Sequence, residues 1–191
     1  MTKAENTIRD FLMRDWRSPV CQLVGIDPGV SGAVASFYLD KSLILAVDVV
    51  RDFKEPENIV SMVRLIDPPA SGPRPSLNCA IERVHAMPRQ GVSSMFTFGR
   101  AFGMAESVIL SREYSLNYYR PQRWQKIIRQ FLDLSCNPDD WREVVEEILP
   151  DTKKFLKRKK DHNTADAILI ALAHSIAEDP DSIWPPQSES Q

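Results

Sequence analysis

The stretch Cys21-Gln-Leu-Val-Gly-Ile-Asp27-Pro-Gly29-Val-Ser-Gly32 decides the fold of this chain. Its first seven residues form a short, largely apolar run that ends in an acid followed by Pro-Gly, the pattern of a buried strand that stops at a turn. Two further apolar stretches, 33–38 and 43–50, are separated by Leu39-Asp-Lys-Ser42, a spacing typical of a hairpin. We therefore expect the fold to open with three antiparallel strands.

Helical and extended patterns alternate after this opening. Residues 56–67 begin with Pro and carry apolar side chains at helical spacing, which predicts a helix against one face of the sheet. The remaining predicted elements are a strand at 77–82, a helix at 94–110, a strand at 115–119 and helices at 121–131, 139–151 and 163–177. This α/β order predicts a mixed five-stranded sheet of three antiparallel strands and two parallel crossovers, with helices on both faces. It is similar to the order of ribonuclease H-like domains.

Length and composition favour one globular domain of 191 residues with short additions. We expect a helical N-terminal extension at 1–20, the ribonuclease H-like domain at 21–178 and a flexible tail at 179–191. The net charge of −2 does not indicate a nucleic-acid binder, so that function would have to depend on local clusters. Three cysteines without a CxxC pair, and no apolar run of about 18 residues, favour a soluble intracellular protein with no membrane partner.

Acidic residues end two of the predicted strands. Asp27 and Glu82 are each a common type of turn residue, but the carboxyl ends of neighbouring strands in an open α/β sheet are also where sites form. A third acidic cluster, Asp161-His-Asn-Thr-Ala-Asp166, opens the last helix. His162 and Asp166 share a helical face that continues as apolar residues, so Asp166 is expected to face the sheet. Asp161 is equally well explained as a helix cap.

The types of these side chains indicate a hard divalent cation. Carboxylates with one histidine suit Mg²⁺ or Mn²⁺ better than zinc. Paired cations about 3.5–4 Å apart activate water and stabilise the leaving 3′ oxygen in phosphodiester hydrolysis. The sequence therefore predicts a nuclease site without a small-molecule cofactor.

Four motifs, in order, resemble the RuvC-like Holliday junction resolvases, most closely their phage and chloroplast branches. They are G-I-D-P-G-V-S-G at 25–32, I-E-R-V-H-A-M-P-R-Q-G-V-S-S-M-F-T-F-G-R at 81–100, Y-Y-R-P-Q-R-W-Q-K at 118–126 and K-K-D-H-N-T-A-D-A-I-L-I-A at 159–171. The resemblance runs from about residue 21 to 177. It implies a ribonuclease H-like fold, Mg²⁺ dependence with Mn²⁺ as a substitute, and a homodimer that places paired symmetric nicks on a four-way DNA junction. The implied setting is the cytoplasm or nucleoid of a bacterium or phage-infected cell, with an organelle or nucleus left open.

The resemblance leaves one ligand position open. Relatives end the acidic set with D-x-x-D or H-x-x-D, whereas the residue three positions before Asp166 is Asn163. Either Asp161 or His162 then fills the fourth place beside Asp27, Glu82 and Asp166. The segment 139–151 is also acidic where relatives are basic, and residues 1–20 precede the usual first strand.

Basic side chains gather in three places that could contact DNA. Six bases stand within 153–160, directly before the predicted ligands, and a second group surrounds the start of the helix at 121. A loop after Glu82 adds two more polar residues beside a flexible Gly91. The candidates are Arg89, Gln90, Arg120, Arg123, Lys126, Lys153, Lys154, Lys157, Arg158, Lys159 and Lys160. A charge run can also be an ordinary solvated face, and Trp124 and the phenylalanines of 96–102 are expected in the core rather than against bases.

Two alternatives stay open from the sequence. Asp27-x-Gly29-x-x-Gly32 also matches the phosphate-binding turn of actin-like and sugar-kinase-like proteins, although these need a second lobe for which 191 residues leave no room. A non-catalytic junction-binding protein would explain the unusual Asn163. The apolar circumference of the helix at 94–110 predicts that part of it packs against a second copy of the chain, and Gly99 and Gly103 would allow close packing.

Overall fold

The computed structural model describes residues 20–29, 31–40, 43–51, 56–67, 76–83, 91–135 and 137–178. Its five strands form one mixed sheet in the order β3-β2-β1-β4-β5. The strands are β1 (Val20–Asp27), β2 (Ala33–Asp40), β3 (Leu43–Arg51), β4 (Ser76–Glu82) and β5 (Leu116–Tyr119). β1, β2 and β3 are antiparallel neighbours, whereas β4 runs parallel to β1 and β5 parallel to β4. The predicted ribonuclease H-like sheet is confirmed.

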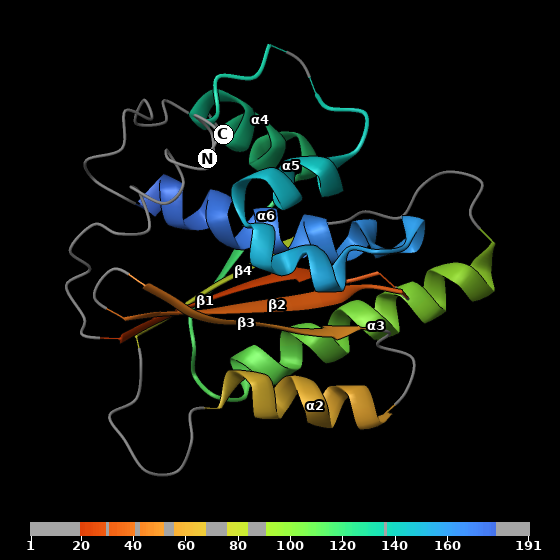
Figure 1. Cartoon of the computed structure of the whole chain (residues 1–191). Helices are drawn as coiled ribbons and strands as arrows, with labels where there is room; N and C mark the ends of the chain where they lie inside the picture. The colour runs from red at the N-terminus through yellow and green to blue at the C-terminus, as the bar shows by residue number, and fades with distance from the viewer. Residues whose placement is uncertain are drawn as a thin grey trace, which may run out of the picture.

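Helices cover both faces of this sheet, as predicted (Figure 1). One face carries α2 (Pro56–Ile66) and α3 (Val92–Leu110). The other carries α6 (His162–Glu178) directly on the strands, with α4 (Pro121–Phe131) and α5 (Trp141–Ile148) packed beside it. Two short 3₁₀ helices, η1 (Pro150–Phe155) and η2 (Lys159–Asp161), connect α5 to α6.

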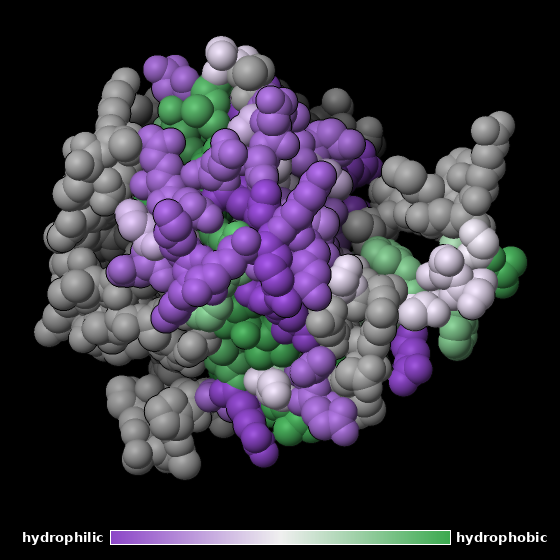
Figure 2. All heavy atoms as spheres, turned by 45° about the vertical axis from the view of Figure 1, so that its right-hand side comes forward, coloured by the Kyte–Doolittle hydropathy of each residue, from purple (hydrophilic) through white to green (hydrophobic). Residues whose placement is uncertain are grey.

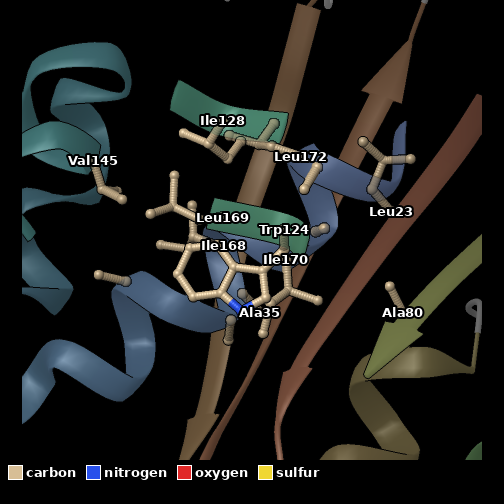
Figure 3. Close-up of a cluster of buried hydrophobic side chains, with 14 of the residues drawn as sticks. Leu23, Ala35, Ala80, Trp124, Ile128, Val145, Ile168, Leu169, Ile170 and Leu172 are labelled. Atoms are coloured by element: carbon tan, nitrogen blue, oxygen red, sulfur yellow. The ribbon is translucent and has the colours of Figure 1, made fainter. Parts of the chain in front are cut away.

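The alternation of β1 side chains separates two cores. Leu23 packs under α4 and α6, whereas Val24 and Ile26 pack on the opposite face against α2 and α3. Because successive strand residues point to opposite faces, Gly25 and Asp27 face the same side as Leu23. Figure 3 shows the core on that side, where side chains from α4 and α6 meet those of the sheet.

α6 approaches β1 more closely than ordinary side chains would allow. A Cβ added at Gly25 would lie 1.9 Å from the carbonyl oxygen of Ala167 and 2.9 Å from the Cβ of Ala171. Both positions on α6 are alanines, so the helix backbone can lie almost directly on the strand. This contact fixes the height of the first turns of α6 above the carboxyl end of β1.

The structure corrects several local predictions. The acidic segment 139–151 is α-helical only at 141–148 and continues as η1, where Pro150 interrupts the helical hydrogen bonds. Gly99 and Gly103 do not pack closely within the described residues, since an added Cβ at either would meet no atom within 4 Å. The predicted extension at 1–20, apart from Val20, and the tail at 179–191 lie outside the described residues. None of the helices in the described ranges is both long enough and apolar enough to cross a membrane.

Replacing Gly25 by Ala should destabilise the protein. The new methyl group would collide with the α6 backbone, so the helix must shift, at a cost of about 2–3 kcal/mol in the free energy of unfolding. Gly91→Ala is the control, because an added Cβ there would meet no atom closer than Ser94 Oγ at 4.0 Å, and it should change the free energy of unfolding by less than about 1 kcal/mol. Urea unfolding of both variants measures the difference. Equal effects of the two substitutions would contradict the close-contact account.

Candidate functional site

Two carboxylates emerge at the same edge of the sheet. β1 and β4 are parallel neighbours whose register pairs Ile26 with Ile81, so Asp27 and Glu82 follow side by side at the strand ends. In β4, Ala80 belongs to the core under α6 and Ile81 to the opposite core. Alternation therefore turns Glu82 toward α6, as it does Asp27. The two strands are therefore neighbours, which is the condition under which the sequence allows these two acids to converge.

Asp166 joins this pair from the second turn of α6. Burial raises the pKa of Asp27 to about 8, and the charges of Asp166 and Glu82 contribute further, against a backbone hydrogen bond from Gly29 and the charge of His162. Burial also raises the pKa of Asp166 to about 7, with contributions from Glu82 and Asp140. The charge of Glu82 thus raises the pKa of both Asp27 and Asp166, and the three side chains Asp27, Glu82 and Asp166 are called the carboxylate triad below.

The triad lacks a compensating positive side chain among the described residues. No ion pair there joins any of the three carboxylates to a lysine or arginine. Within those same ranges, no three His, Cys, Asp or Glu side chains are gathered in a way that could hold a metal ion. The triad is thus a set of partly buried acids without a paired base rather than a preformed coordination sphere.

Each strand-end acid accepts a specific hydrogen bond. The backbone N–H of Gly29 donates to Asp27, from the turn that Gly32 closes by donating its own N–H to the Gly29 carbonyl at 2.8 Å. Glu82 accepts from the indole Nε1 of Trp124 at 2.7 Å, between Nε1 and Oε2. Burial raises the pKa of Glu82, and the bond from Trp124 opposes that shift.

His162 and Asn163 have different surroundings at the start of α6. His162 is exposed, and its Nδ1 lies 3.2 Å from the carbonyl oxygen of Lys159. An Nδ1–H tautomer donates to that carbonyl and leaves Nε2 as the basic nitrogen. Asn163 is buried and donates from Nδ2 to the backbone oxygen of Ser31 at 2.7 Å. It anchors the turn that follows Asp27.

Asp161 belongs to an ion-pair cluster and not to the triad. Its carboxylate accepts from the backbone N–H of Arg158 at 2.8 Å and pairs with the guanidinium of Arg158 at 2.9 Å and of Arg51 at 3.3 Å. Burial raises the pKa of Asp161, but the hydrogen bonds from Arg158 and the two arginine charges outweigh it, so the net shift is downward. Arg51 also donates to Thr164 and Phe155, which ties β3 to η1 and α6.

The basic candidates lie around the start of α6 and α4. The six bases of 153–160 are all exposed, and hydrophilic side chains form a continuous surface on the side of the molecule where α6 begins (Figure 2). Two of the basic candidates contact other side chains of the same chain. Arg158 pairs with Asp161, and the Arg123 guanidinium lies 5.0 Å from the centre of the Tyr119 ring. Arg120, just before α4, and Lys126, within α4, are exposed on either side of Arg123 in the sequence. Arg89 and Gln90 lie outside the described residues.

Sequence analysis missed two residues of this site. Trp124 is in the core, as expected, but its indole also donates to Glu82, and nothing in the sequence distinguishes the two roles. Asp140 caps the N-terminus of α5 by accepting from the backbone N–H of Arg142, and it lies close enough to raise the pKa of Asp166. The acidic segment therefore reaches the edge of the triad.

Comparison with known proteins gives structural neighbours only. No protein-family model matches the chain, and no curated protein matches it. Among solved structures, the chain is similar to RuvC from T. thermophilus in complex with a Holliday junction substrate, at 20% identity and a TM-score of 0.44, over 81% of this chain and 92% of that one. A Thermus thermophilus RuvC structure gives 18% identity and a TM-score of 0.47, over 81% and 93%. Because both values are low, the ribonuclease H-like assignment rests on the strand order and pairing of this chain.

Replacing Asp27 by Asn should stabilise the metal-free protein, and more so at high pH. The pKa of Asp27 is about 8 when folded against an ordinary value of 3.8, so the folded state keeps a proton that the unfolded chain releases. The contribution of Asp27 to the free energy of unfolding therefore falls as pH rises from about 4 to about 8. Asn does not titrate, so the substitution removes this pH-dependent loss of stability.

Urea unfolding in the presence of a chelator, near pH 4 and near pH 8, measures this dependence. Asp151→Asn is the control, because it removes an exposed carboxylate of η1 and should leave both midpoints nearly unchanged. If Asp27→Asn increased the stability over wild type by the same amount at both pH values, the raised pKa of Asp27 would be contradicted.

Proposed function

We propose that this protein is a divalent-metal-dependent endonuclease that cuts four-way DNA junctions. The observation that carries the proposal is the carboxylate triad, in which three partly buried acids from β1, β4 and α6 stand without an arginine or lysine partner in the described chain. Like charges in such a setting are costly unless a cation compensates them. The four ordered sequence motifs support the specific substrate.

The chemistry of the donor set suits Mg²⁺ or Mn²⁺, and the side chains would have to draw together around the ion, since within the described residues they are not gathered as a metal site. Asp27, Glu82 and Asp166 supply only oxygen ligands, the type that these hard cations prefer. His162 is the fourth candidate, whereas Asp161 is left out of the proposed ligand set because its carboxylate already pairs with Arg51 and Arg158. A bound divalent cation supplies activation of a water and stabilisation of the leaving 3′ oxygen in phosphodiester hydrolysis.

The chain itself holds the substrate and the acids in place. Asn163 and the Gly29 N–H fix the turn and the carboxylate at the end of β1, so Asp27 needs little reorganisation. Lys157, Lys159 and Lys160 are exposed immediately before α6 and offer positive charge to the DNA backbone beside the triad. Arg120, at the N-cap of α4, can add a phosphate contact at a helix N-terminus.

A homodimer is the proposed assembly, because paired nicks on a twofold-symmetric junction require two sites related by the same axis. The surface of α3 supports it. Val92 is 86% exposed, and Phe96, expected in the core from the sequence, is 74% exposed, which is unusual for large apolar side chains on a monomer. A shallow groove of about 580 Å³ runs between α2 and α3 past Gly99 and Gly103. These glycines would let the backbone of a second α3 approach closely.

Asp27→Asn and Glu82→Gln should each abolish junction cleavage and leave junction binding within about threefold of wild type. Each substitution removes one ligand charge but little DNA-contact surface. Single-turnover nicking of a labelled four-way junction in saturating Mg²⁺, beside gel-shift titration in a chelator, measures both effects. A matched linear duplex is the substrate control, and Asp151→Asn the protein control. Cleavage by either variant at a rate within about threefold of wild type would contradict the assignment of that residue as a metal ligand.

Phe96→Glu should convert the dimer to a monomer. A charge on the exposed apolar face of α3 would be buried without a partner in the dimer, so association should weaken strongly. Light scattering measures the mass, and cruciform plasmid cleavage measures whether both strands are cut within one binding event. Gln130→Glu on α4 adds the same charge at an exposed site away from α3 and should stay dimeric. A monomeric wild-type chain that still makes paired cuts would refute this assembly.

A further inference from the structure

We propose that Trp124 is a positioning residue for the nuclease site, whose indole N–H holds one oxygen of the Glu82 carboxylate and leaves the other available to a cation. The inference rests on the proposed function and adds a residue of α4 to a site otherwise built from β1, β4 and α6. It assigns a role to a side chain that the sequence indicates only as part of the core.

The contact itself is short, and its donor is buried. Nε1 of Trp124 lies 2.7 Å from Oε2 of Glu82, and the tryptophan is 1% exposed. An indole N–H is a donor only, so a buried one needs an acceptor. Here that acceptor is a member of the carboxylate triad rather than a backbone carbonyl. The same bond counteracts the rise in the pKa of Glu82 that burial produces.

The donor is held rigidly. The Trp124 ring lies within the apolar core shared by α4, α6 and the sheet, near Ile168 and Ile170 of α6 (Figure 3). The Trp141 ring packs on it with centroids 5.4 Å apart. A large side chain fixed on several sides cannot follow a moving carboxylate, so it restrains Glu82 to one orientation.

The position along α4 explains why this helix can link DNA contact to the site. Arg120 caps the helix on the exposed side, and Trp124, one turn later, reaches inward to Glu82. β5 leads directly into α4, and its last residue Tyr119 pairs in register with Glu82. The strand, the helix and the carboxylate are therefore connected through short contacts.

Calorimetric titration with Mn²⁺ tests the proposal without requiring cleavage. The samples are the full chain, Trp124→Phe and Trp141→Phe, with thermal melts to check folding. Trp124→Phe keeps an aromatic ring but deletes the donor, and it should weaken Mn²⁺ binding about 10-fold or more, as loss of a partner behind a metal ligand does. Trp141→Phe removes a neighbouring indole that does not bond Glu82 and should bind Mn²⁺ like wild type.

Resonances of the indole N–H groups test it in the unmodified chain. The sequence holds four tryptophans, so four indole signals are expected. Adding Mg²⁺ should shift the signal of Trp124 more than that of Trp141, because only Trp124 bonds a ligand. This measurement decides the matter even if Trp124→Phe does not fold.

The outcomes of these experiments distinguish a failure of the Trp124 proposal from a failure of the proposed nuclease function. A wild-type chain that binds no Mn²⁺ and cuts no junction overturns the proposed function itself. If the wild type does bind Mn²⁺, two results overturn only the role of Trp124: equal affinity in Trp124→Phe, or an equal loss in Trp141→Phe, which would reflect packing. An unmoved Trp124 resonance in saturating Mg²⁺ has the same meaning. Weaker binding in Trp124→Phe alone, with a shifted resonance, supports the positioning role.

Discussion

The backbone contact between β1 and α6 at Gly25 is the constraint on which the site depends. A side chain at this position would push α6 away by the width of a methyl group or more, since its Cβ would start 1.9 Å from the Ala167 carbonyl oxygen. Asp166 precedes Ala167, so any such shift moves it away from Asp27. The core and the triad therefore share one determinant: a glycine facing alanines where the strand meets the helix.

Acids at the start of α6 show how environment assigns different roles to one residue type. Asp161 is buried against Arg51 and Arg158 and has a lowered pKa, so it remains charged and stabilises the fold. Asp166, just over one turn later, is partly buried beside other acids and has a pKa raised to about 7. Asp161 is thus part of a structural ion pair, whereas the repulsion between Asp166 and its acidic neighbours is reduced only when a cation or a proton binds.

The sequence predicted the order of the elements well because each strand and helix carries its own periodic pattern. Asp27 and Glu82 could also be placed, since strand ends follow from the patterns and parallel neighbours share an edge. The partners of Asp161 and Trp124 could not. Arg51 lies 110 positions before Asp161, and Glu82 lies 42 positions before Trp124, so both contacts depend on how distant elements pack. Gly99 and Gly103 have no close neighbour within the described chain, because a small residue permits close packing without specifying a partner.

In the sequence, the acidic segment 139–151 and the six bases of 153–160 stand as two separate blocks of opposite charge. In the folded chain, Arg142 pairs with Asp140 and Lys153 with Glu146, so part of each group is used within the region that joins α5 to α6. Lys157, Lys159 and Lys160 form no such pair in the described chain and are exposed beside the start of α6. The pairing of charges in the folded chain therefore differs from what the count of charges along the sequence suggests. Two acids of the segment 140–146 are thus paired with nearby bases, while the three lysines stay exposed for the backbone contact proposed above.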